Sequence, residues 1–167
     1  MGNITNGEKI MMVRWLGVSV SGEKAIIVDA SVPENESEPI TINNDFTLSL
    51  QKGDKAEAYA TLHSELADYA REQNITASVV KASAVSQQGR PTLAHFHSAE
   101  LRGVVIAALA SVCETKAVAK ATMSKNIGER NVDDYARDAG FWNENFEGGV
   151  RAGSKEAAFC ILTQCRK

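Results

Sequence analysis

Histidine and cysteine are the residue types in this sequence that most readily bind metals or attack substrates. His95 and His97 are separated by one residue, and His63 precedes them by about thirty positions. Residues two apart on a helix point about 200° away from each other, so this pair cannot face one zinc ion there. In a loop both rings could reach a ligand, but no Cys, Asp or third His lies nearby in the sequence. We therefore expect a polar helix start at His95 and His97 rather than a zinc site.

The three cysteines, Cys113, Cys160 and Cys165, are an odd number and show neither CxxC nor Cys/His metal spacing. Two of them lie in apolar, helix-like surroundings, which is typical of reduced thiols in a cytoplasmic protein. The first ten residues lack the basic start and apolar run of a signal peptide, and no run of about 18 apolar residues occurs. We expect a cytoplasmic protein with no membrane segment.

The segment Gly17-Val18-Ser19-Val20-Ser21-Gly22 could do a different kind of chemistry. Successive backbone N–H groups in a glycine-bounded turn can cradle a phosphate, which would make the chain a nucleotide-binding regulator. An ordinary Ser-Gly hairpin turn explains the same residues, and short motifs often mislead. We favour the turn and keep the nucleotide-binding regulator as the weaker alternative.

Several cations could contact the phosphates of a nucleic acid. The chain carries 18 Lys and Arg against 21 Asp and Glu, a formal net charge of -3, which argues against coating nucleic acid by bulk charge. The cations are scattered and have no interleaved aromatic platform, so we expect weak, salt-sensitive binding at most. The possible nucleic-acid rim consists of Arg90, Lys116, Lys120, Lys125 and Arg130.

Aromatic residues cluster between Gly140 and Gly149, where Phe141, Trp142 and Phe146 fall in a segment that we expect to be a loop. A loop of this kind could bind a partner or stack on nucleic-acid bases. It could equally cover the edge of the core, since half-buried aromatic residues are common. The sequence leaves both interpretations open.

The first half of the chain carries patterns that predict a sheet. With 167 residues, 44% of them hydrophobic, we expect one domain over residues 11–167 after a flexible N-terminal arm, residues 1–10. Alternating apolar residues predict strands at 13–20, 25–30 and 40–50, the first two joined by a glycine-containing hairpin turn. A helix with apolar spacings of three and four follows over 54–73, with Asp54 as its cap, and then a buried strand at 75–80.

The second half predicts mainly helices. The most apolar helix spans 93–113, and a brief strand at 116–121 and a polar loop at 122–129 follow it. We expect a short helix over 132–138, a glycine-rich loop over 147–153 and a last helix over 153–165. The order β-β-β-α-β-α-β-α indicates an α/β fold with a three-strand antiparallel meander plus parallel strands, flanked by helices.

Three motifs within this order are similar to those of RuvC-type resolvases in the ribonuclease H-like superfamily. Residues 16–21, Leu-Gly-Val-Ser-Val-Ser, resemble the family's Leu-Gly-Ile-Asp-Pro-Gly opening. Residues 79–81 and 100–104 resemble its second acidic strand and the following helix, and residues 156–162 resemble its final Asp-Ala-Leu-Ala-Ile-Ala helix. The similarity in element order covers about 150 residues. It implies a ribonuclease H-like fold and a homodimer formed through helix 93–113.

The resemblance also implies a site, and the departures from the family pattern are informative. A two-metal phosphodiester site needs several carboxylates from separate elements as hard oxygen ligands. Where the family has acids this sequence has Ser19, Lys81 and Gly153, and only Glu156 keeps a carboxylate. One carboxylate cannot hold a metal pair, and an ammonium group opposes metal charge. We expect a degenerate pocket without metal or cofactor, closed by a Lys81 to Glu156 ion pair.

The leading function is therefore a non-catalytic binding or assembly protein that contacts nucleic acid or a protein that handles it. The alternative is a divergent nuclease in which Glu156 combines with Glu100, Asp133 or Asp134 to hold Mg²⁺ or Mn²⁺.

Overall fold

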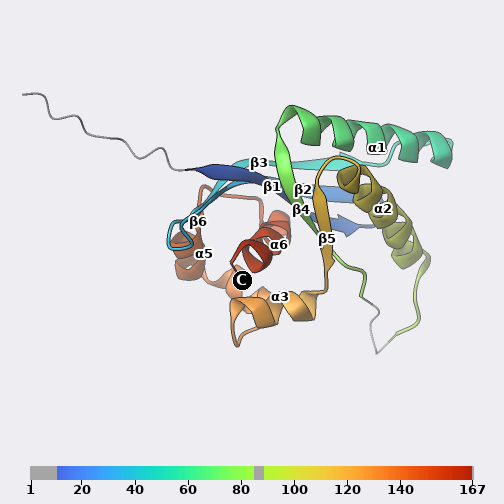
Figure 1. Ribbon diagram of the computed structural model, residues 1–167. Coiled ribbons are helices and arrows are strands. Elements are labelled where there is room, and N and C mark those ends of the chain that lie inside the picture. The colour runs from blue at the N-terminus through green and yellow to red at the C-terminus, as the bar shows by residue number, and fades with distance from the viewer. Residues whose placement is uncertain (1–10, 85–88, 167) are drawn as a thin grey trace, which may run out of the picture.

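The computed structural model describes residues 11–84 and 89–166, and its centre is one six-stranded sheet (Figure 1). The spatial order is β5-β4-β1-β2-β3-β6. The first three strands pair antiparallel, while β4 runs parallel to β1, β5 to β4 and β6 to β3. This is the predicted meander with added parallel strands. The predicted arm, residues 1–10, lies outside the described residues. The strands are β1 (Met12–Ser21), β2 (Lys24–Pro33), β3 (Ile40–Ser49), β4 (Ile75–Lys81), β5 (Glu114–Val118) and β6 (Phe146–Glu147).

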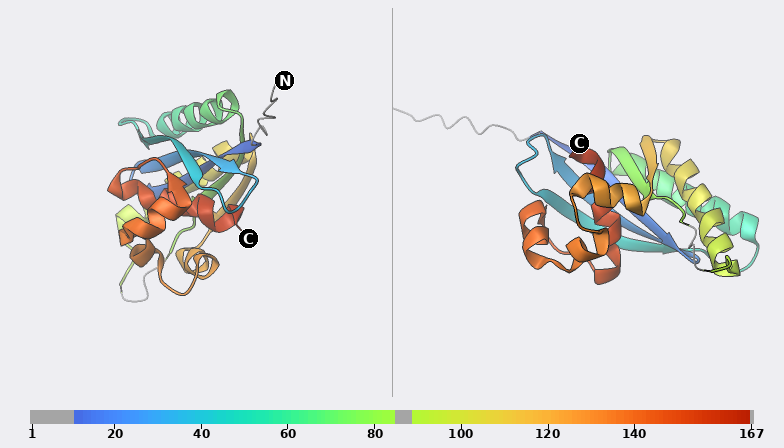
Figure 2. Two further views of the ribbon diagram at one scale, coloured as in Figure 1. Left: turned by 90° about the vertical axis from the view of Figure 1, so that its left-hand side faces the viewer. Right: turned by 90° about the horizontal axis from the view of Figure 1, so that it is seen from below.

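Helices cover both faces of the sheet, as the views in Figure 2 show. Helices α1 (Lys55–Glu72) and α2 (Leu93–Ala110) pack with Leu16, Val18 and Ile27 on one face. On the other face, α6 packs with Val28 and Val79, and three short helices surround it. Alternate residues of β1 and β2 therefore serve two separate cores. The elements of the second face are α3 (Lys120–Ile127), α4 (Val132–Arg137), α5 (Ala139–Asn145), the 3₁₀ turn η1 (Ala152–Ser154) and α6 (Lys155–Cys165).

Gly17 sets the position of α6 on the sheet. A side chain at this residue would place its Cβ 1.9 Å from the carbonyl oxygen of Ala157, well inside van der Waals contact. Only glycine lets the first turns of α6 lie this close to β1. The close approach brings Glu156, which precedes Ala157, over the neighbouring residues of β1.

Local signals define the ends of several elements as predicted. Ser21 pairs with Lys24 across a two-residue hairpin turn, and Gly22 at its first central position has a φ of 59°. This matches a turn in which glycine takes the left-handed conformation. The Asp54 carboxylate accepts a hydrogen bond of 2.9 Å from the Glu57 amide and so caps α1.

Two predictions for the second half were wrong. Residues 120–127 form α3, where we expected the end of a strand and a polar loop. Residues 139–145 form α5 rather than a loop, with the Asp138 side chain accepting from the Phe141 amide. Each helix has eight residues or fewer and only two or three apolar anchors, so packing on α6 stabilises it more than its own sequence periodicity does.

Aromatic residues of α5 and β6 cover the edge of the core. Trp142 and Phe146 are buried, and their stacked rings lie 4.2 Å apart between centroids. Both also contact Phe159 of α6 edge-on. Of the two interpretations left open by the sequence, the structure confirms the core cover.

Candidate nucleic-acid site

The side chains of Lys81 and Glu156 form an ion pair where β4 ends and α6 begins. Lys81 is the last residue of β4, and Glu156 lies in the first turn of α6. Both side chains are 22% exposed, so the pair is accessible from one side. The Ser19 hydroxyl of β1 lies 3.5 Å from Glu156 Oε1 and donates to it. The structure thus brings together three residues of the predicted pocket and contains the predicted ion pair.

Gly153, the fourth residue of that pocket, lies in η1 immediately before α6. It has no side chain to contribute, and the space around its Cβ position is open. Gly153 therefore shapes the approach to α6 without a functional group of its own.

A second ammonium group, that of Lys120, approaches the same carboxylate. Its Nζ lies 3.4 Å from Glu156 Oε2 and 3.0 Å from Asp133 Oδ1. Burial lowers the pKa of Lys120, but the hydrogen bond to Asp133 and the charge of Glu156 outweigh it and raise the pKa overall. Lys120 is therefore protonated at neutral pH. The pocket is a cluster of two ammonium groups and two carboxylates, which we call the Glu156 cluster: Ser19, Lys81, Lys120, Asp133 and Glu156.

Solved structures similar to this one include Holliday junction resolvases. RuvC of Thermus thermophilus aligns with a TM-score of 0.67 at 12% identity, over 92% of this chain and 96% of that one. RuvC of T. thermophilus in complex with a Holliday junction substrate aligns with a TM-score of 0.64 at 12% identity, over 92% and 95% of the two chains. The yeast mitochondrial Holliday junction resolvase aligns with a TM-score of 0.64 at 14% identity, over 92% and 78%. This chain has a RuvC-type, ribonuclease H-like fold.

At 12 to 14% identity these alignments show the fold alone. No protein-family model matches the chain, and no curated protein matches it either. The chemistry that this scaffold supports therefore depends on the side chains of this protein.

The residues of the Glu156 cluster do not fit a pair of divalent metal ions. Lys81 contacts one carboxylate oxygen of Glu156 and Lys120 approaches the other. Each oxygen that could bind a metal ion is therefore already beside an ammonium group. Across residues 11–84 and 89–166, no three His, Cys, Asp or Glu side chains are grouped so that they could hold a metal ion. Two divalent ions need several converging carboxylates, and this arrangement offers ammonium groups instead.

The three acids of the nuclease alternative lie in different places. Glu100 of α2 faces α1, where it accepts hydrogen bonds of 2.9 Å from Lys55 and from the Tyr59 hydroxyl. Asp134 points toward Arg137 on its own helix, at 4.0 Å. Only Asp133 reaches the cluster, through the shared Lys120.

The cations of the predicted rim do not gather around Glu156 as a group. Lys120 joins the cluster, whereas Lys116 pairs with Glu114 at 3.1 Å and Arg130 pairs with Asp138 at 2.9 Å. Lys125 of α3 and Arg90, which precedes α2, are exposed. Helical spacing of Lys120, Met123 and Ile127 was the signal that could have placed Lys120 at the cluster, because Met123 packs on Cys160 of α6.

A backbone N–H group that a phosphate cradle in segment 17–22 would need is already hydrogen-bonded. The backbone N–H of Gly22 donates to the Ser98 hydroxyl of α2 at 2.7 Å. In addition, the Ser19 side chain points to Glu156 rather than to the turn. The segment 17–22 thus serves as a hairpin that docks on α2.

The histidines and cysteines take structural positions. His95 Nδ1 accepts a hydrogen bond of 2.9 Å from the Thr92 amide, which confirms the predicted polar start of α2. All three cysteines are free thiols. Burial raises the pKa of Cys160 to about 12 and that of Cys165 to about 11. Since the thiolate is the reactive form, these two thiols are poor nucleophiles at neutral pH.

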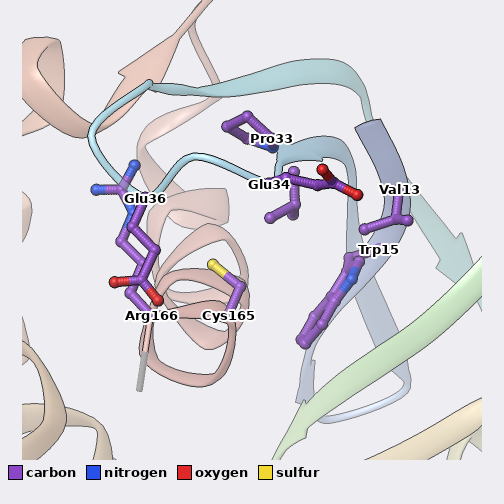
Figure 3. Close-up of a pocket in the computed structure, with 8 residues that line it drawn as sticks. Val13, Trp15, Pro33, Glu34, Glu36, Cys165 and Arg166 are labelled. Carbon is purple, nitrogen blue, oxygen red and sulfur yellow. The ribbon is translucent and has the colours of Figure 1, made fainter. Parts of the chain in front are cut away.

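A separate hollow of about 200 Å³ lies near the opposite end of α6 from Glu156 (Figure 3). Trp15 of β1 and Cys165 of α6 line it, together with Val32, Pro33 and Arg166. Cys165 lies nine positions after Glu156 on α6, about 14 Å of rise along the helix. The hollow is therefore not part of the Glu156 cluster. Among the described residues, no helix has the length and hydropathy needed to cross a membrane.

Proposed function

We propose that this protein binds nucleic acid through its RuvC-type scaffold without cleaving it by a metal-dependent reaction. The observation that carries the proposal is the contact of two ammonium groups, those of Lys81 and Lys120, with the single carboxylate of Glu156. Similar solved structures are Holliday junction resolvases, one of them in complex with a junction substrate, which supports nucleic acid as the ligand class.

The charges of the cluster support weak rather than tight binding. The charges of the two ammonium groups and of the carboxylates of Glu156 and Asp133 sum to zero. The pocket therefore attracts phosphate only when an ammonium group turns away from its carboxylate toward the ligand. Lysine can do so because its charge lies on a flexible stem with three rotatable donors. Affinity should consequently fall steeply with salt.

Fluorescence anisotropy tests this proposal with labelled single-stranded, duplex and four-way-junction DNA and with RNA, at several salt concentrations. We expect binding by the wild type and a loss of affinity of about fivefold or more in Lys81→Gln and Lys120→Gln, since each removes one ammonium contact. Lys52→Gln, an exposed lysine before α1, is the matched control. Absence of binding to every substrate contradicts the nucleic-acid ligand. Cleavage in Mg²⁺ or Mn²⁺ contradicts the non-catalytic role.

A divergent metal-dependent nuclease is the second candidate, and the position of Asp133 favours it over other enzyme classes. Asp133 and Glu156 both contact Lys120 Nζ, so two carboxylates already lie around one ammonium group. Cleavage that depends on Mn²⁺ and disappears in both Glu156→Gln and Asp133→Asn would support this candidate. Cleavage that survives both substitutions would point to a contaminating enzyme.

We also propose a homodimer formed through α2. A shallow groove of about 450 Å³ runs between α1 and α2 and is lined by small and apolar residues, among them Ala60, Gly103, Val104 and Ala107. A side chain at Gly103 would meet open space, so a second helix could approach closely there. Sedimentation velocity should report a dimer for the wild type and a monomer for Gly103→Arg. A monomeric wild type would contradict the dimer.

The cytoplasm is the proposed location. Its support is the chemistry of the thiols: Cys113, Cys160 and Cys165 are all free, and Cys160 is fully buried. Fractionation of cells that express the tagged protein tests the location.

A further inference from the structure

Arg102 of α2 is a buried cation close to the strand ends that carry the Glu156 cluster. The residue is only 8% exposed. Its Nη2 donates to the carbonyl oxygen of Val20 at 3.2 Å, and its Nη1 donates to the carbonyl oxygen of Ser98 at 3.4 Å and to the hydroxyl of Ser83. Val20 follows Ser19 on β1, and Ser83 lies two residues beyond Lys81. The guanidinium therefore lies beside the end of the same two strands, on their α2 side.

The charge of Arg102 has no counter-ion in the part of the chain that the structure describes. No Asp or Glu oxygen of residues 11–84 and 89–166 lies within 4.0 Å of the guanidinium, and Nε has no hydrogen-bond partner there. The sequence between Lys81 and Glu100, which includes the connection to α2, contains neither Asp nor Glu. This connection cannot supply the missing negative charge.

Such an arrangement costs folding free energy. A buried charge without an opposite charge is unfavourable, and carbonyl and hydroxyl dipoles compensate only part of the lost hydration. Burial lowers the pKa of Arg102, but an arginine remains charged at neutral pH. By contrast Arg14 of β1 pairs with the buried Asp29.

We propose that Arg102 binds a phosphate group, and that in the complex with nucleic acid this is a backbone phosphate lying next to the Glu156 cluster. The second half of this proposal rests on the proposed function. A planar guanidinium with N–H groups in a fixed fork matches the oxygens of a phosphate. Ser83 is exposed and its hydroxyl accepts from Nη1, so a phosphate oxygen that arrives from solvent can replace this hydroxyl as the acceptor.

Inorganic phosphate tests the site without nucleic acid. Thermal unfolding is measured from 0 to 100 mM phosphate, with NaCl adjusted to constant ionic strength. We expect the Tm of the wild type to rise with phosphate and the Tm of Arg102→Gln to stay constant. Arg71→Gln, an exposed arginine at the end of α1, removes the same charge and should respond as the wild type does. An equal rise in Arg102→Gln overturns the proposal.

Arg102→Lys covers the case in which Arg102→Gln does not fold. It keeps the positive charge but lacks the fork of donors, so we expect its phosphate response to weaken severalfold. A response of Arg102→Lys equal to that of the wild type overturns the proposal, because a point charge alone would then suffice.

Anisotropy with duplex DNA distinguishes the nucleic-acid phosphate from a free phosphate. Loss of one phosphate contact should reduce the slope of log K against log salt by about 0.9 and the affinity by about tenfold. If the wild type binds DNA and Arg102→Gln binds with the same slope, the inference fails and the proposed function stands. If the wild type responds to phosphate through Arg102 but binds no DNA, the proposed function fails and the anion is a free phosphate.

Discussion

Two carboxylates on opposite faces of the sheet, Asp29 and Glu156, hold very different cations. Asp29 is fully buried under α1, where it accepts a hydrogen bond of 3.0 Å from Arg14 Nε and one of 2.7 Å from the Tyr69 hydroxyl. Glu156 is 22% exposed at the strand ends and contacts two lysines, which lie on β4 and α3. The first carboxylate is enclosed by the protein, and the second is open to solvent on one side.

Position in the sheet explains the difference. Asp29 lies in the middle of β2, between β1 and β3, so this carboxylate is shut off from solvent even though Arg14 is 31% exposed. Glu156 lies at the start of a helix above the ends of β1 and β4, where solvent reaches both lysines. A buried pair of this kind stabilises the fold only while it is complete, whereas partly exposed pairs contribute little and can exchange partners. This difference agrees with a structural role for the Asp29 network and with the binding role proposed for the Glu156 cluster.

Removal of Asp29 should give the largest effect. Asp29→Ala removes the carboxylate that pairs with Arg14 and accepts from the Tyr69 hydroxyl. We expect the free energy of unfolding to fall by about 3 kcal/mol, the lower end for a broken buried pair because Arg14 is 31% exposed. Urea denaturation measures it. Asp68→Ala, which breaks an exposed pair with Arg71, should cost less than about 0.5 kcal/mol. An equal loss of unfolding free energy in the two variants would contradict the structural role of Asp29.

Conversion of the Glu156 cluster toward a metal site should give the next largest effect. Lys81→Glu replaces an ammonium group beside Glu156 by a carboxylate, and calorimetric titration should show Mn²⁺ affinity raised at least tenfold, about 1.4 kcal/mol. Lys120→Gln in the same chain should raise it further, since it removes the second cation from Glu156. Lys52→Glu adds the same charge elsewhere and serves as the control. Unchanged affinity in Lys81→Glu would count against this placement of the site.

High pH should weaken the Asp29 network through Tyr69. Burial and the hydrogen bond to Asp29 raise the pKa of Tyr69 to about 12, so the folded state holds its proton more tightly than the unfolded state does. This stabilisation is complete below pH 10 and is lost as the pH rises from about 10 to 12. Urea denaturation across this range should show the loss in the wild type and a smaller one in Tyr69→Phe. An identical pH dependence in both would contradict the assignment.

Coupling within the Glu156 cluster should be the smallest of these effects. A double-mutant cycle with Lys81→Met and Glu156→Gln should give about 0.5 to 1 kcal/mol, because both side chains are partly exposed. The corresponding cycle for Arg14 and Asp29 should exceed it at least twofold. A larger coupling for Lys81 and Glu156 would mean that their pair is structural too.

Residue patterns close together in the sequence predicted the fold well. Period-two alternation marked β1, β2 and β3, and period-3.6 spacing marked α1 and α2. Short helices were missed at α3 and α5, because each depends on the surface of α6 rather than on a long periodic pattern.

The sequence by itself determined five of the six strands, the glycine in β1 and the meeting of Lys81 with Glu156, because each follows from local periodicity or from a motif whose spacing survives in this chain. Only the tertiary structure decided that Lys120 and Asp133 join Glu156 and that Arg102 lies buried without a counter-ion among the described residues. The physical reason is that electrostatic neighbours are set by distance in space. Residues such as Lys120 and Glu156, 36 positions apart on two helices, meet only after both helices have packed on the sheet.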